Sequence, residues 1–206
     1  MITELDLGPD DVVDGRLFAH PDHIPADHST LNMLVRDVAR RIIGPDPISV
    51  WVPDSEHWYQ RVIVPRPDRL LAATAACVVG FFGRRRDDVD TDVAATVFAI
   101  SRHLEDQIPS VPGILAYSTR LLSDERNYAN LVLMDDFATA ARWRTVEPHP
   151  RASAELSRRF YDFVRIYRAE LEIADITRDG MTRLLSVRYW DYRSDPVWTA
   201  TRALGT

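Results

Sequence analysis

The sequence contains no lysine, so all 25 of its strongly basic residues are arginines. Pyridoxal-phosphate enzymes and class I aldolases need a lysine for their Schiff base, and the phosphate-binding P-loop needs one as well. These classes are therefore excluded. The chain has a single cysteine, Cys77, within the apolar run "AACVVGFF". It cannot form a disulfide framework, and we expect a reducing, cytoplasmic compartment with Cys77 as a small buried hydrophobe.

Long apolar runs are also missing. No run approaches the roughly 18–20 residues needed to cross a bilayer, and the acidic start "MITELDLGPDDVVDG" lacks the basic and apolar regions of an export signal. The net charge of −6 argues against nucleic acid as the main partner, because phosphate backbones select basic surfaces. The motifs of serine hydrolases, Rossmann folds and zincins are absent as well.

The length of 206 residues, 46% of them hydrophobic, suits one domain with an extension. We divide the chain into an N-terminal α+β region, 1–72, and a larger domain, 73–206. The N-terminal region is expected to run strand–helix–strand–strand. Its predicted elements are the strand Gly15–His20, a helix from Ser29 to Gly44, and the short strands "ISVWV" and "YQRVIV".

The larger domain starts with an apolar, β-branched run, Ala76–Phe82, that predicts a strand buried on both faces. An amphipathic helix follows, with Glu105 away from its apolar stripe. The stripe is Val93, Val97, Ile100, Leu104 and Ile108. The segments Gly113–Leu122 and Tyr128–Met134 predict a hairpin.

A second helix is expected from Asp135 or Asp136, broken at Pro148-His149-Pro150 and resumed over 151–171. The stripe of the resumed part is Ala152, Leu156, Phe160, Phe163, Tyr167 and Leu171. The aromatic segment Thr182–Tyr192 predicts the last strand.

The order β-α-β-β-α-β predicts a ferredoxin-like α+β fold, with both helices on one face of an antiparallel sheet. The other face would be apolar and uncovered. Two solutions stay open. A second copy could cover that face in a homodimer, or the N-terminal region could be a degenerate second copy that closes the barrel within one chain.

The stretch from Ala76 to Tyr192, a little over half of the chain, resembles the dimeric α+β barrel superfamily, which includes antibiotic-biosynthesis monooxygenases. The resemblance is carried by "ACVVGFF", "GILAYSTRLLSDERNYANLVLM", "DDFATAARWRTVEPHPRASAEL" and "LLSVRYWDY". It implies a pocket between the sheet and the helices. It implies no single chemistry, because these barrels host oxygenases, haem enzymes, isomerases and ligand binders.

His149 is the first candidate site residue, as a general acid or base or an axial metal ligand; the alternative is a surface residue in a rigid helix break. In related barrels the break borders the cavity, so Trp143 and Tyr161 would flank the same space. His103 lies at the edge of its helix stripe, where it could share the cavity or be structural.

The strands supply further candidates. Tyr117 and Asn130 lie on the hairpin and Trp190 on the last strand, where they could hold a substrate or be ordinary sheet residues. His20, His23 and His28 form a possible metal cluster, but their spacing matches no standard zinc pattern, and a capped loop before the Ser29 helix is the preferred interpretation.

Taken together, these features predict an enzyme of natural-product metabolism that oxygenates or rearranges a hydrophobic small molecule in an apolar cavity. His149, Tyr117 and Asn130 would be catalytic, and Trp143, His103, Tyr161 and Trp190 would contact the substrate. We expect no bound metal and no required cofactor. The alternatives are a haem enzyme with His149 or His103 as axial ligand, and a non-catalytic binding module.

Overall fold

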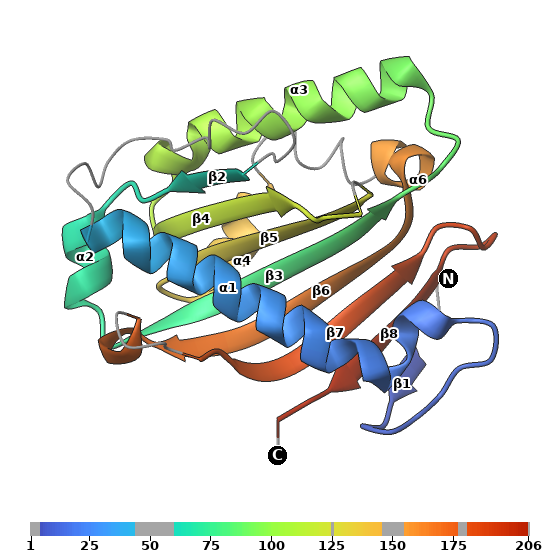
Figure 1. Cartoon of the computed structure of the whole chain (residues 1–206), viewed down its shortest axis with the longest axis horizontal. Helices are drawn as coiled ribbons and strands as arrows, with labels where there is room; N and C mark the ends of the chain where they lie inside the picture. The colour runs from blue at the N-terminus through green and yellow to red at the C-terminus, as the bar shows by residue number, and fades with distance from the viewer. Residues whose placement is uncertain (1–4, 44–59, 125, 146–154, 177–180, 206) are drawn as a thin grey trace.

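A computed structural model of the chain describes residues 5–43, 60–124, 126–145, 155–176 and 181–205. These residues form one eight-stranded sheet in the order β1-β8-β7-β6-β3-β5-β4-β2 (Figure 1). All neighbouring strands are antiparallel except β1 and β8. The strands are β1 (Leu5–Leu7), β2 (Gln60–Ile63), β3 (Ala75–Arg85), β4 (Ile114–Leu121), β5 (Asn127–Met134), β6 (Tyr161–Glu172), β7 (Arg183–Asp191) and β8 (Trp198–Ala203).

Five α-helical segments are described. They are α1 (Ile24–Ile43), α2 (Pro67–Ala72), α3 (Thr91–Gln107), α4 (Phe137–Trp143) and α6 (Ser157–Phe160). None of the described helices combines the length and the apolar character that a membrane crossing requires. The expectation of an α+β chain is confirmed, whereas the expected barrel is not, because the described sheet is open between its edge strands β1 and β2.

The order β3-α3-β4-β5-α4-α6-β6 follows the predicted alternation. The prediction was wrong about the fourth strand, which it placed at Thr182–Tyr192 and which the structure has at Tyr161–Glu172. Residues 161–171, predicted as helix, form strand β6, and the helical part ends at Phe160. The physical reason is a two-residue period: Tyr167, Ala169 and Leu171 are buried, and Arg168 between them is exposed. β6 therefore fits between β3 and β7 and pairs with both of them. The predicted strand Thr182–Tyr192 is confirmed as β7, a fifth strand.

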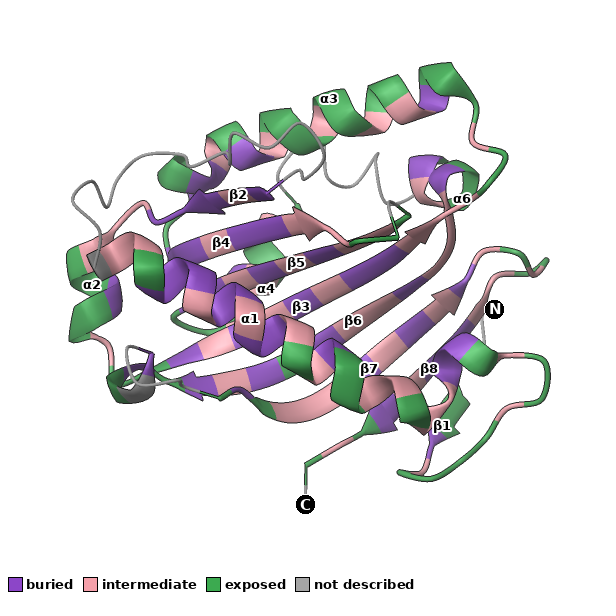
Figure 2. Cartoon of the chain, in the orientation of Figure 1, coloured by how far each residue is buried: buried purple, intermediate pink, exposed green. Residues whose placement is uncertain are grey.

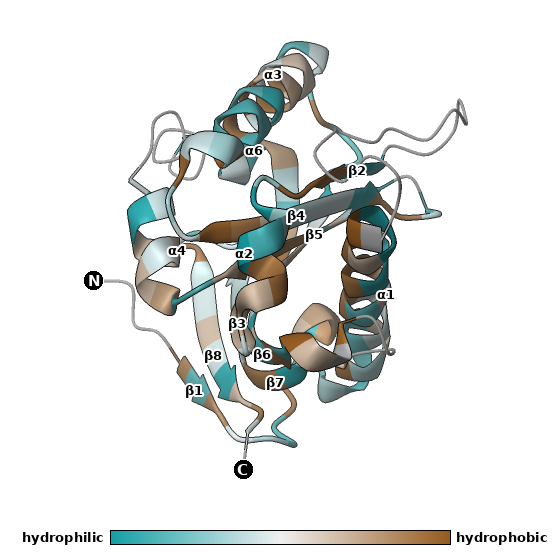
Figure 3. Ribbon diagram, turned by 90° about the vertical axis from the view of Figure 1, so that its left-hand side faces the viewer, coloured by the Kyte–Doolittle hydropathy of each residue, from teal (hydrophilic) through white to brown (hydrophobic). Residues whose placement is uncertain are grey.

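The sheet face expected to need a second copy is covered by α1 (Figure 3). Its side chains Leu31, Leu34, Val35 and Val38 have no exposed surface. The helix lies so close to β3 that a Cβ added at Gly80 would come within 2.5 Å of Leu31 Cδ2. Only glycine leaves room for this contact, so helix and strand are matched in shape.

The N-terminal region joins the same sheet and core, since its strands extend the sheet and α1 packs on it. β1 pairs with β8, and β2 pairs with β4. Two of its predictions need correction. The expected strand Gly15–His20 is a short 3-10 helix, Leu17–Ala19, and the helix expected from Ser29 begins at Ile24. "ISVWV" lies outside the described residues.

The opposite face, under α3 and α4, is less completely covered. Figure 2 shows α3 mostly exposed, whereas buried residues run along the central strands and the inner side of α1. Of the residues in α3, only Val93 and Glu105 are buried. The middle of the predicted apolar stripe, Val97, Ile100 and Leu104, is partly exposed. Among the described residues, the α3 side of the sheet is therefore the less completely covered one.

Candidate functional site

The hairpin of β4 and β5 presents polar side chains to the α3 side of the sheet. Alternation along the strands sends Tyr117 and Thr119 of β4 to this side and buries Ser118 on the α1 side. In the register, Thr119 is opposite Asn130 and Tyr117 is opposite Val132. Two of the three predicted catalytic residues, Tyr117 and Asn130, are thus diagonal neighbours on one face.

A buried carboxylate lies over this face. Glu105, in the last turn of α3, is only 3% exposed. Arg61 Nη1 of β2 donates to its Oε2 at 2.5 Å, and the Tyr117 hydroxyl donates to its Oε1 at 3.3 Å. Arg61 also donates to Asp106 at 2.9 Å. The guanidinium supplies the countercharge that a buried carboxylate needs, so the Tyr117 hydroxyl is held against a charged acceptor.

Asn130 has a fixed orientation. Thr119 Oγ1 lies 2.5 Å from Asn130 Oδ1, which makes this oxygen the acceptor of the hydroxyl. The amide nitrogen then carries two N–H groups that find no acceptor in the described part of the chain. Since Asn130 is partly exposed, these donors are accessible to a ligand on the α3 side.

Trp143 borders the same area. It packs, partly buried, against an apolar cluster that also contacts Tyr117 and Val132. The cluster consists of Ile63, Ile108, Val111 and Ile114. Tyr117, Asn130 and Trp143 are therefore brought to one region, with an apolar wall on one side and hydrogen-bonding groups on the other.

Among the other predicted site residues, Tyr161 adjoins this region, since its ring packs on Phe81, the residue opposite Asn130 in the β3–β5 register, whereas His103 and Trp190 make their contacts elsewhere. His103 is exposed, and its Nε2 lies 2.6 Å from the side-chain nitrogen of Gln107. Tyr161 packs edge-to-face on Phe81, 5.5 Å between ring centroids, and burial raises the pKa of its hydroxyl. Trp190 lies on β7 with the Arg188 guanidinium 4.9 Å from its ring. His149 lies outside the described residues.

The three N-terminal histidines do not converge. His20 Nδ1 accepts from the Asp22 backbone N–H, and His28 Nε2 lies 2.6 Å from the Thr182 carbonyl oxygen. The ring nitrogens of His23 are buried, and neither of them has a hydrogen-bond partner among the described residues. Within the described ranges, no group of three potential ligands could hold a metal ion. The cluster suggested by the spacing is thus dispersed over a 3-10 turn and the start of α1.

Comparison with known proteins leaves the chain without a family. No family model matches the sequence, and no curated protein matches it. Among solved structures, it is similar to protein SO0527 from Shewanella oneidensis, with 12% identity and a TM-score of 0.38. The match covers 48% of this chain and 94% of that one. Neither fold nor function follows from so remote a likeness.

Proposed function

We propose that the chain is an enzyme that oxygenates or rearranges a hydrophobic small molecule on the α3 side of the sheet. The observation that supports this proposal most is the arrangement of Glu105, Arg61 and Tyr117 beside Asn130. A charged, hydrogen-bonded group lies next to accessible amide donors. Small-molecule sites usually consist of a few polar groups in apolar surroundings.

The surroundings favour an aromatic substrate with an oxygen substituent. Val79, Phe81 and Val132 are partly exposed on this face, and Trp143 borders it. The Asn130 amide would donate to a phenolate or carbonyl oxygen. Tyr117 and Glu105 would take up the proton lost when the electron-rich ring is activated, because hydroxyl and carboxylate are already hydrogen-bonded in series. The resemblance adds His149 as a further proton-transfer residue.

Binding is tested first, with a panel of naphthols and quinones followed by the quenching of tryptophan fluorescence. We expect Asn130→Leu to weaken binding of the best ligand by about tenfold, the effect of losing one hydrogen bond to a charged oxygen. Thr199→Val is the matched control, since Thr199 lies on the same sheet face but on the far strand β8. Equal affinity of both variants would refute this site.

Turnover is tested with the same ligands in an oxygen electrode. Tyr117→Phe should lower kcat at least tenfold while the affinity changes little, because the variant keeps the ring and loses the hydroxyl. Binding without oxygen uptake or product would favour a non-catalytic binding module. A strong Soret band after expression with haem, shifted by His149→Ala, would favour the haem enzyme instead.

A further inference from the structure

We propose a second ligand site on the α1 side of the sheet, which takes a small aromatic carboxylate against Phe82 and Phe163 and binds its charge with Arg84 and Arg165. This site uses none of the residues placed in the α3-side site. It lies on the opposite face of the sheet, so the two proposals are independent.

The site is a cavity of about 240 Å³ between the first turns of α1, the strands β3 and β6, and the β4–β5 hairpin. The β3–β6 register creates it, because Arg84 is opposite Phe163 and Phe82 is opposite Arg165. All four side chains therefore share one face and line the same space. Its volume is below the roughly 300–1,000 Å³ of drug-sized pockets, which favours a single ring.

Arg165 is held rigidly at the wall of the cavity. Its side chain is 13% exposed and forms a forked pair with Asp27, with distances of 2.6 Å from Nε to Oδ2 and 2.8 Å from Nη2 to Oδ1. Its guanidinium lies 5.7 Å from the Phe82 ring and 5.6 Å from the Phe163 ring. The remaining nitrogen, Nη1, has no partner within the described residues. A preorganised donor is thus left for a ligand.

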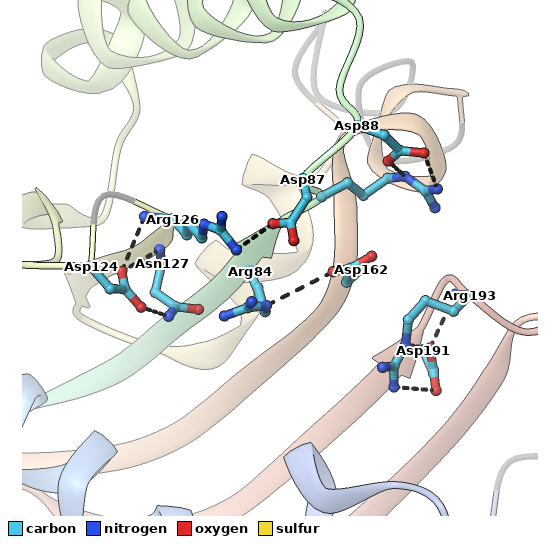
Figure 4. Close-up of polar contacts among 10 residues, drawn as sticks. Arg84, Asp87, Asp88, Asp124, Arg126, Asn127, Asp162, Asp191 and Arg193 are labelled. Carbon is cyan, nitrogen blue, oxygen red and sulfur yellow. Dashed lines mark hydrogen bonds and ion pairs between the residues drawn. The ribbon is translucent and has the colours of Figure 1, made fainter.

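Arg84 has even more unused hydrogen-bonding capacity. Arg84 forms an ion pair with Asp162, at 3.8 Å from Nε to Oδ2, which is too long for a hydrogen bond, and its charge helps to lower the pKa of Asp124 (Figure 4). The neighbouring carboxylate of Asp124 is already bonded to the Asn127 side chain and to two backbone N–H groups. Both terminal nitrogens of Arg84 therefore lack acceptors among the described residues.

The guanidinium nitrogens that the described residues leave free around the cavity, rather than a net positive charge, point to an anionic ligand. Asp27 compensates Arg165, and Arg84 has the carboxylates of Asp162, at 3.8 Å, and Asp124 near it. A planar carboxylate matches the fork of a guanidinium, and the attached ring would pack against Phe82 and Phe163, the latter already stacked on Phe18 at 4.6 Å. The two arginines thus select a planar anionic acid, and the two phenylalanines select an aromatic ring.

The experiment is calorimetric titration of the full chain with benzoate, and with benzamide as a neutral ligand of the same shape. Benzoate should bind saturably below about 10 mM, and benzamide should bind at least tenfold more weakly. Arg84→Gln should reduce benzoate affinity by about tenfold. Arg86→Gln is the matched control, because Arg86 pairs with Asp88 at 2.9 and 3.1 Å and does not line the cavity.

The outcomes separate the two proposals. Benzoate binding should survive Asn130→Leu, which disrupts only the α3-side site. Absence of saturable binding, equal affinity for benzamide, or equal affinity of Arg84→Gln and Arg86→Gln would each overturn the carboxylate site. Far-UV circular dichroism of each variant verifies that the fold is retained before its affinity is compared.

Discussion

His23 should make the fold sensitive to acid. Its side chain is 14% exposed, its ring packs edge-to-face on Tyr189 at 5.7 Å, and its Nε2 lies 3.9 Å from Asp27 Oδ2. Burial, and next the positive charge of Arg165, lowers the pKa of His23 from 6.5 to about 3. Arg202 and His20 lower it further, and a backbone contact of His20 opposes them. The imidazole is therefore neutral in the folded chain.

The size of the effect follows from the two pKa values. Between pH 6.5 and 3 the unfolded chain binds a proton at this position and the folded chain does not, so the free energy of unfolding falls as the pH falls. The contribution of His23 to the free energy of unfolding is fully present above the pKa of the unfolded chain, 6.5. Between pH 6 and pH 4, it should decrease by about 2.5 kcal/mol, since each pKa unit is worth about 1.4 kcal/mol.

The assay is urea unfolding of the wild type and His23→Gln at pH 6 and pH 4. Other groups that titrate in this range contribute to both proteins and cancel in the comparison, so the wild type should lose about 2.5 kcal/mol more than the variant. His103→Gln, which removes an exposed histidine, supplies the control. A difference between wild type and His23→Gln that stays constant with pH would refute the assignment of His23 as a buried neutral imidazole.

Three further predictions concern stability, each measured by urea unfolding. Arg202→Met should lower the free energy of unfolding by about 3–5 kcal/mol. The reason is that Arg202 is fully buried and donates to the backbone carbonyls of Gly8, Pro9, Asp11 and Ala19. A decrease below about 1 kcal/mol would contradict this. Gly80→Ala should cost about 1–3 kcal/mol through its clash with Leu31, and adding Leu31→Ala should cost less than the sum of both changes; simple additivity would contradict the contact. Thr199→Val should raise the free energy of unfolding by about 0.5–1 kcal/mol, since Thr199 Oγ1 is buried without a partner in the described chain, and a loss would show that the hydroxyl is satisfied.

The misplacement of β6 shows the limit of periodicity. Phe160, Phe163, Tyr167 and Leu171 recur at helical spacing, while Tyr167, Ala169 and Leu171 recur at strand spacing. The residues fit both patterns, and the sequence alone does not decide between them. The decision comes from the sheet, where β6 completes the backbone hydrogen bonds of both β3 and β7. No local pattern carries that information.

The candidate site was predictable in part for the same reason. Tyr117 and Asn130 follow from the hairpin, because alternation and strand pairing are local consequences of the sequence. Glu105 was missed, since it lies away from the apolar stripe of its helix and would ordinarily face solvent. Its partner Arg61 reaches it only because β2 extends the sheet beside β4. The contact between Arg61 and Glu105 joins residues that are 44 positions apart in the sequence.

The role of α1 connects fold and function. The apolar side of this helix was recognised in the sequence, but the surface on which it packs was not. An amphipathic pattern shows only that one side of a helix is buried, and not against which element. By packing Leu31 against Gly80, α1 covers the face for which a second copy was expected. The less covered face is then the one under α3, and the site proposed there stays accessible within a single chain. The start of the same helix places Asp27 against Arg165 and so forms one wall of the second cavity. One helix therefore determines which side of the sheet is open and where the other side retains a small opening.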